Sequence, residues 1–394
     1  MLEQKEIKPK KYVRIAMYDD TNHLVDLNVG IPEKSSLILG NKVGLIQNIY
    51  EHYPTIANLR DIAFKQAWRW DEIDMTPDID QVNNPDFRKE VDILIETLSF
   101  QAAGDSLAAR GVSTILRPII SSNALEGLCV EWERQELVHG LTYSEILRVV
   151  FADRSTELLN YIAQNKNALQ RALYMGKIFN ETYVNNIKYE MGSKNYKKNH
   201  IEEIRKLVVK YFTVMLCLEA ISFKASFAST FMLVETTGAF TRIGKNIQLI
   251  AKDELLHSEF SREIIRLLKE DKEWRDIFND DEVILFNKFA ISTILGYEYE
   301  WSRNLFSNGR TMIGLNANIL QDYTGFCARY VYDSLEYPYC DPVRNVKSNP
   351  LPELDRKWFC LDLIQTASQE IPINNYRLNS VRNNLSNNTK FEYL

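Results

Sequence analysis

The feature that most constrains this chain is the absence of proline from its long central part. All eleven prolines lie at or before Pro118 or at or after Pro338, so residues 119–337 contain none. Proline removes a backbone donor and clashes with the preceding helical turn, so a gap of this length favours long helices. Within it, apolar residues recur at intervals of three and four, as at Phe212 and Leu216, which is the spacing of one helix face. The sequence therefore predicts an all-α fold.

The same periodicity predicts where the helices and the flanking segments lie. The expected helices span about 88–115, 122–152, 155–190, 198–236, 239–270, 281–307 and 310–333, with a shorter one near 355–368. The expected organisation is an N-terminal arm over 1–85, a helical domain over 86–340, a C-terminal helix and extension over 341–376 and a flexible tail over 377–394. The arm holds a candidate strand pair in KYVRIAMYDDTNHLVDLN, and the tail has too few apolar residues to fold alone.

Composition excludes several classes of protein. The chain has 394 residues, of which 45% are hydrophobic and 25% charged, which is typical of a globular protein with a large core. Its net charge is −6 and its lysines and arginines are scattered, so nucleic-acid binding gets no support. No uncharged apolar run approaches the ~18 residues of a membrane span. Five cysteines without a CxxC pair suit a reducing compartment, so we expect a cytoplasmic protein that does not bind membranes.

The motif ExxH occurs twice, as Glu136 with His139 and as Glu254 with His257. Residues three apart share a helix face, so each pair can direct two ligands at one point. The motif alone is weak, because a histidine three places after an acidic residue also arises by chance. A single buried histidine is also more often satisfied by a hydrogen bond than by a metal.

The positions of these pairs strengthen the prediction, because they fall on the apolar stripes of their helices. Two further carboxylates, Asp105 and Glu219, continue apolar stripes on two other expected helices, and each precedes one of the ExxH pairs. Tyr143 follows His139 by four residues on the same stripe. The sequence therefore places four acids, two histidines and a tyrosine toward the core.

Four carboxylates buried together must be neutralised, because an unpaired buried ion costs several kcal/mol. No lysine or arginine occupies these stripes. Two divalent cations would balance the four negative charges, and two neutral imidazoles would complete the ligand set. One acid from each of two helices and ExxH from each of two others is the pattern of a four-helix dimetal-carboxylate bundle. The predicted ligands are Asp105, Glu136, His139, Glu219, Glu254 and His257.

Four stretches of the chain resemble the small (beta), radical-generating subunit of class I ribonucleotide reductase. They are GDSLAAR around Asp105, WERQELVHGLTY at 132–143, LEAISFKASF at 218–227 and LIAKDELLH at 249–257. The resemblance implies a ferritin-like helical bundle that binds two iron ions, with dimanganese or mixed manganese and iron as alternatives. It also implies that the dimetal centre activates dioxygen and oxidises Tyr143 to a stable radical. A phenol with a pKa near 10 is neutral at pH 7, so its oxidation also needs an acceptor for the proton.

The resemblance also suggests roles for residues around the ligand set. Phe223, Phe227 and Ile250 match the family's hydrophobic pocket around the radical. Trp68 matches a tryptophan that is linked through Asp253 to the ligand His139 for electron delivery. Trp132 matches a tryptophan that hydrogen-bonds a ligand carboxylate.

Towards the C-terminus, Glu370 and Tyr376 match the acid and tyrosine that pass the radical to a partner protein. That partner is the large (alpha) catalytic subunit, which reduces ribonucleotides to deoxyribonucleotides and binds the C-terminal tail, here ending in KFEYL. This tail is rich in asparagine, with Arg377, Arg382 and Lys390, whereas the tails of the family are commonly acidic. The resemblance further implies a homodimer.

Two other functions fit the same ligand pattern. A stand-alone dimetal oxidase or oxygenase would use the same metals on a small substrate, without a partner subunit or a docking tail. A helical bundle that stores iron or serves as a scaffold would bind many metals per chain or none.

Overall fold

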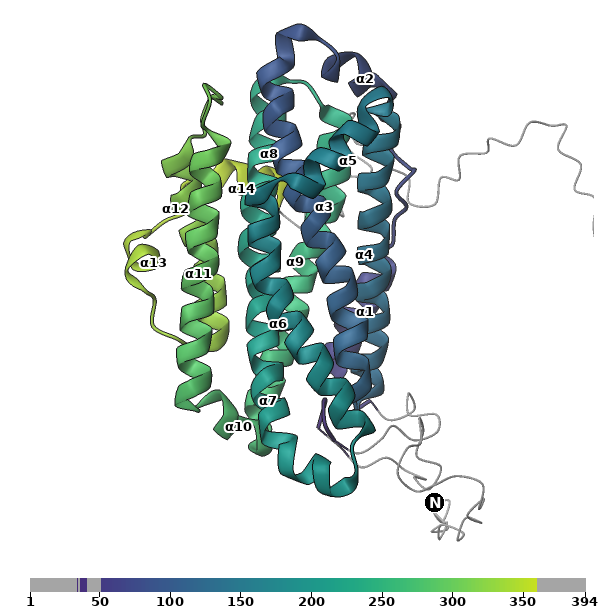
Figure 1. Cartoon of the computed structure of the whole chain (residues 1–394), viewed down its shortest axis with the longest axis vertical. Helices are drawn as coiled ribbons and strands as arrows, with labels where there is room; N and C mark the ends of the chain where they lie inside the picture. The colour runs from purple at the N-terminus through teal and green to yellow at the C-terminus, as the bar shows by residue number, and fades with distance from the viewer. Residues whose placement is uncertain (1–33, 35, 41–50, 360–394) are drawn as a thin grey trace, which may run out of the picture.

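The computed structural model describes residue 34, residues 36–40 and residues 51–359, and it confirms the all-α fold in this part of the chain (Figure 1). The long helices are α3 (Arg88–Leu116), α4 (Asn123–Val149), α6 (Lys166–Met191), α7 (Lys194–Cys217), α9 (Thr241–Glu270), α11 (Asp281–Leu305) and α12 (Ala317–Leu335). The shorter helices are α1 (Pro54–Lys65), α2 (Thr76–Val82), α5 (Ser155–Gln164), α8 (Lys224–Thr237), α10 (Lys272–Phe278), α13 (Asp341–Asn345) and α14 (Pro352–Trp358). In this described part the β structure is limited to two isolated bridges, Ile38 with Ile120 and Met312 with Leu315.

Four of these helices form a closed ring around the centre of the bundle. Helix α3 packs against α4, α4 against α9, α9 against α8, and α8 against α3. Helix α6 covers α3 and α7, α1 covers α4 and α9, and the pair α11 and α12 forms the flank on the left of Figure 1. This ring is the ferritin-like four-helix core that the sequence predicts. None of the described helices combines the length and the apolar composition needed to cross a bilayer.

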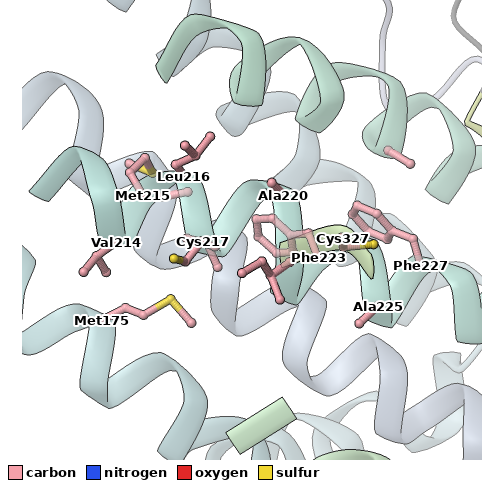
Figure 2. Packing of buried hydrophobic residues seen from close by; sticks show 14 of the residues in the cluster. Met175, Val214, Met215, Leu216, Cys217, Ala220, Phe223, Ala225, Phe227 and Cys327 are labelled. Carbon is pink, nitrogen blue, oxygen red and sulfur yellow. The ribbon is translucent and has the colours of Figure 1, made fainter. Parts of the chain in front are cut away.

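The connection between α7 and α8 is a π-helix, Leu218–Phe223, which keeps the two α-helices in one continuous rod. All six of its residues are buried. Figure 2 shows the buried apolar side chains along this stretch, from Val214 to Phe227, which belong to the same core cluster as Met175 of α6 and Cys327 of α12. A π-helical turn is wider than an α-helical one and is frequently found at functional sites.

The N-terminus of α9 is fixed by side chains of α2. Asp78 is fully buried, and its Oδ2 accepts hydrogen bonds from the backbone N–H groups of Arg242 and Ile243 at 3.0 and 2.8 Å. Gln81 accepts a further bond from the backbone N–H of Phe240, which has a left-handed φ of 57°. Because the first N–H groups of a helix have no partner within it, these contacts set where α9 begins.

Three of the expected helices differ in the structure. The expected helix 155–190 is wrong, because the chain breaks at Asn165, whose side chain caps α6 by accepting from the backbone N–H of Ala168. The expected helix 310–333 begins only at Ala317, after a loop with left-handed residues at Asn308, Gly309 and Gly314. The helix near 355–368 appears as α14, ending at Trp358. Beyond Phe359 the expectation lies outside the described residues, as does the strand pair of the arm.

Helices α1, α2 and α10 were not predicted from the sequence. The first two are short and begin near prolines, which the search for long proline-free periodic segments passes over. Proline is compatible with the first helical turn, where its missing N–H would have no partner. The capping of α9 by α2 therefore had no counterpart in the prediction.

Candidate metal centre

The structure brings all six predicted ligand side chains to one place inside the four-helix ring. Asp105 comes from α3, the first ExxH pair from α4, Glu219 from the π-helix and the second ExxH pair from α9. All six side chains are buried, with no more than 2% of the surface of any of them exposed.

The ligand atoms form two overlapping groups, in each of which the atoms lie within 4.8 Å of one another. Subsite A consists of Asp105, Glu136, His139 and Glu254, and subsite B consists of Glu136, Glu219, Glu254 and His257. Glu136 and Glu254 belong to both groups, so two carboxylates bridge the two subsites. Two cations held in this way would be neighbours.

The distances show how Glu254 lies between the two histidines. Its Oε1 is 3.1 Å from Nδ1 of His139, and its Oε2 is 2.8 Å from Nδ1 of His257. Asp105 Oδ1 lies 2.9 Å from His139 Nδ1, on the far side of subsite A, and Glu136 Oε1 lies 3.3 Å from His257 Nδ1. Both imidazoles thus present Nδ1 to the carboxylates.

Several carboxylate oxygens of the cluster have no hydrogen-bond partner. They are Oδ2 of Asp105, Oε2 of Glu136, both oxygens of Glu219 and Oε1 of Glu254. Buried polar atoms in proteins almost always have partners, so unpaired oxygens gathered at one point fit a site that binds cations. Within the described residues, these carboxylates form ion pairs only with the two histidines. A donor set of carboxylate oxygen and imidazole nitrogen fits iron or manganese, so the residues present fit two such ions.

The electrostatics of the cluster also fit a site that binds cations. Burial raises the pKa of Asp105 to about 8 and that of Glu219 well above its ordinary value, and the negative charge of Glu254 raises the Glu219 pKa further. Burial lowers the pKa of His257, but the charges of Glu254 and Glu136 and the hydrogen bonds to them together outweigh it and bring this pKa to about 9. Hydrogen bonds that the His139 ring donates to Asp105 and Asp253 likewise raise the pKa of His139 despite its burial. Without cations, the cluster therefore retains protons shared between its carboxylates and imidazoles.

The outer nitrogens of both histidines are held by side chains beyond the cluster. Nε2 of His139 lies 3.2 Å from Oδ2 of Asp253, and Trp68 Nε1 donates to the same oxygen at 2.8 Å. Nε2 of His257 lies 3.2 Å from Oε1 of Gln135. With Nε2–H donating outward, the lone pair of Nδ1 is left for a cation.

Gln135 is a partner that the sequence analysis missed. It lies next to Glu136 on α4, where a glutamine carries no motif of its own. Trp132, by contrast, donates from Nε1 to Oε1 of Glu136 at 3.1 Å, as the sequence analysis expected.

Tyr143 lies on α4 one turn beyond His139, with 4% of its surface exposed. Its hydroxyl has no geometric hydrogen-bond partner, and its pKa is raised well above the ordinary value by burial and then by the charges of Asp105 and Glu254. The phenol is therefore neutral at pH 7 and lies close to subsite A. Its contact with the pocket residues Phe223, Phe227 and Ile250 stays a prediction, although all three are buried.

The ring of Phe223 passes directly over Gly104, the residue before Asp105. A Cβ at Gly104 would lie 2.6 Å from Cε1 of Phe223, closer than carbon atoms can approach. The glycine thus lets the π-helix lie against α3 beside subsite A. Phe223 also stacks on Phe227, with ring centroids 5.6 Å apart.

Glu370, Tyr376 and the tail 377–394 lie outside the described residues. Their predicted roles in radical transfer and docking therefore have no structural counterpart here.

Comparison with known proteins places this geometry in a family. The family model described as "Ribonucleotide reductase, small chain" matches residues 47–350. The ribonucleoside-diphosphate reductase subunit beta of Buchnera aphidicola subsp. Acyrthosiphon pisum (strain APS) is 30% identical over 373 residues, which cover 91% of this chain and 96% of that protein.

Among solved structures, the ribonucleotide reductase R2 subunit from Clostridium botulinum superposes with a TM-score of 0.68 at 19% identity, over 85% of this chain and 99% of that one. An R2-like ligand-binding oxidase with a Mn/Fe cofactor superposes with a TM-score of 0.53 at 14% identity, over 74% of this chain and 93% of that one. At such identities the structures share the fold, and the fold alone does not separate reductase subunits from oxidases.

The raised pKa values predict that metal binding displaces protons. Asp105 and His257, with pKa values of about 8 and 9, both carry a proton at pH 7 and must lose it to bind a cation. Manganese(II) affinity should therefore increase as the pH rises from about 6 toward 8, with protons released to the buffer. Titration calorimetry in buffers of different ionisation enthalpy measures this release. A binding heat that is the same in all buffers would contradict it.

Proposed function

The chain belongs to the ribonucleotide reductase small-chain family, and we propose that Tyr143 is the residue on which it generates and stores a radical. It is the small subunit of a ribonucleoside-diphosphate reductase, an oxidoreductase that acts together with a large catalytic subunit. The observation that carries the proposal is the pair of subsites sharing Glu136 and Glu254, with Tyr143 one helical turn from the ligand His139.

We propose Asp105, Glu136, His139, Glu219, Glu254 and His257 as the ligands of two metal ions. We propose two iron ions, and dimanganese or a mixed pair of manganese and iron is compatible with the same donors. When bound, the ions supply the chemistry that activates dioxygen and removes one electron from the Tyr143 phenol.

The surroundings of Tyr143 determine where its proton goes and how long a radical lasts. Loss of an electron makes the phenol strongly acidic, and Asp105 is the carboxylate whose charge acts most on it. We therefore assign the proton of Tyr143 to Asp105. The buried position of Tyr143 and the apolar side chains of Phe223, Phe227 and Ile250 support the exclusion of water and reductants.

We propose the line Trp68, Asp253 and His139 as the electron path to the metal centre. The contacts of 2.8 and 3.2 Å that join these side chains support it, and the Trp68 ring also lies 6.1 Å from the His139 ring, inclined by 25°. Asp253 would keep the tautomer of His139 and take up the Trp68 proton. Beyond the described residues, we propose that Glu370 and Tyr376 pass the radical to the large subunit.

Tyr143→Phe should abolish the tyrosyl radical, because phenylalanine has no hydroxyl to lose a proton and an electron. The measurement is electron paramagnetic resonance after reconstitution with iron and exposure to air. Tyr211→Phe is the matched control, since Tyr211 is fully buried and its raised pKa also reflects the charges of Glu219 and Glu136. An unchanged signal in Tyr143→Phe would reject the assignment of the radical.

Deletion of residues 377–394 should abolish binding to the large subunit, because this tail is the proposed docking segment. It should leave the radical signal intact, because the tail lies outside the family match, which ends at residue 350. Co-sedimentation with the large subunit measures the binding. Oxidation of a small substrate by this chain alone, with no partner protein, would instead favour a stand-alone dimetal oxidase.

We further propose that the protein is a cytoplasmic homodimer. Large apolar side chains are exposed on neighbouring α1 and α4, namely Phe64 at 68%, Val130 at 44% and Leu137 at 61%. A second copy would remove such a surface from water. Sedimentation velocity at micromolar concentration should show twice the chain mass of 45.9 kDa, and a species of one chain mass alone would contradict the dimer.

A further inference from the structure

A buried ion pair outside the metal centre joins α6 to α11. Arg171 of α6 donates from Nε to Oε1 of Glu298 at 2.8 Å and from Nη2 to Oε2 at 2.6 Å. Arg171 is 1% exposed and Glu298 is fully buried. This is a two-point contact between a guanidinium and a carboxylate, the geometry that fixes orientation most strongly.

The same pair contacts the π-helix through Ser222. The hydroxyl of Ser222 donates to Oε1 of Glu298 at 2.6 Å, and its backbone carbonyl accepts from Nη2 of Arg171 at 3.3 Å. Ser222 lies three residues after Glu219, so the contact acts on the opposite end of the short segment that presents this ligand.

A second route connects the ion pair with the π-helix through aromatic rings. The guanidinium of Arg171 lies between the ring of Phe100, 3.3 Å from its centroid, and the ring of Trp301, 4.3 Å from its centroid. The ring of Phe100 in turn packs on Phe223, the last residue of the π-helix, with centroids 5.9 Å apart. The guanidinium of Arg171 thus contacts the π-helix directly at Ser222 and indirectly through Phe100.

Stability alone does not account for a buried ion pair here. Removing two charges from water costs about as much as their attraction returns, and well-packed apolar side chains often replace such pairs without loss. What apolar side chains cannot supply is the directional contact with one hydroxyl and one carbonyl. The pair therefore contributes geometry at the π-helix more than free energy of folding.

We propose that the pair Arg171–Glu298 is a positioning device for Glu219: it holds the π-helix Leu218–Phe223 through Ser222 and so sets the position of Glu219, one of the two ligands that belong to subsite B and not to subsite A. The inference rests on the proposed function only in assuming that the two subsites bind metal. Asp105 and His139, which complete subsite A, lie on α3 and α4, and the pair contacts α3 through the ring of Phe100.

The consequence is selective weakening of one metal site. Loss of the pair should weaken metal binding at subsite B roughly tenfold to a hundredfold, the range found when residues that orient metal ligands are changed. Subsite A should keep its affinity. A general loss of stability would affect both subsites together, because α4 and α9 supply ligands to both.

The experiment uses the full-length chain, manganese(II) alone as the probe and the double variant Arg171→Met with Glu298→Leu, which leaves no unpaired buried charge. Bound manganese is counted by electron paramagnetic resonance during titration. The expected result is one site of unchanged affinity, one weakened site and loss of the coupled two-manganese signal at low metal concentration. Hydrogen exchange at Leu218–Phe223 should become faster. Equal weakening of both sites, or no change in either, would overturn the inference.

Two further variants assign the weakened site. In a Glu219→Gln background the double variant should cause no additional loss, because the ligand on which the pair acts is already removed. Asn186→Leu is the structural control: Asn186 is fully buried on the same helix α6 and donates to the backbone carbonyl of Ile115 at 2.8 Å, away from the π-helix. It should lower the thermal stability without separating the two affinities.

Ser222→Ala keeps the ion pair and removes only the hydroxyl that links it to the π-helix, so it tests the inference even if the double variant folds poorly. It should weaken subsite B less than the double variant and leave subsite A unchanged; an unchanged subsite B would count against the inference. Failure of the proposed function gives a different result, because the unaltered chain would then bind no manganese at either subsite.

Discussion

The mutual repulsion of four buried carboxylates is the constraint on which the rest of this structure depends. Asp105, Glu136, Glu219 and Glu254 are at most 2% exposed, so water does not screen them. Without cations, protons must be retained within the cluster, as the pKa of Asp105 near 8 shows. Such a cluster opposes folding, and the large apolar core around it has to outweigh that cost. Cations that bind only the folded chain shift the balance further toward the folded state.

The convergence of the six candidate ligands could be predicted from the sequence because helical periodicity encodes the direction of their side chains. An acid and a histidine three residues apart on an apolar stripe both point toward the core. Two such pairs together with two lone acids on other helices fit few arrangements other than a four-helix site. The inward position of Tyr143 could be predicted for the same reason, since it lies four residues from His139 on the same stripe. The link from Trp68 to Asp253 came from the family resemblance, as the two residues are far apart in sequence.

What the sequence did not reveal depends on tertiary contacts. The π-helix is invisible to a search for apolar periodicity, because one widened turn barely disturbs the pattern on either side. Gln135 holds His257 only because α4 and α9 lie at a particular distance. The break at Asn165 is a local capping contact within a stretch that reads as continuous helix. The pair Arg171 and Glu298 is separated by more than a hundred positions, so neither residue signals the other.

Charge balance explains why polar groups close to the ligands do not compete with the metals. A lone arginine beside this cluster would neutralise a carboxylate and take the place of a cation. Arg171 contacts the π-helix three residues from Glu219, but Glu298 cancels its charge, so the pair adds no net positive field there. Asp253 adds a negative charge next to His139, and the Trp68 N–H and the imidazole satisfy one of its oxygens. The groups that orient the ligands are therefore neutral or paired, which leaves the four carboxylates as the place where divalent cations bind most favourably.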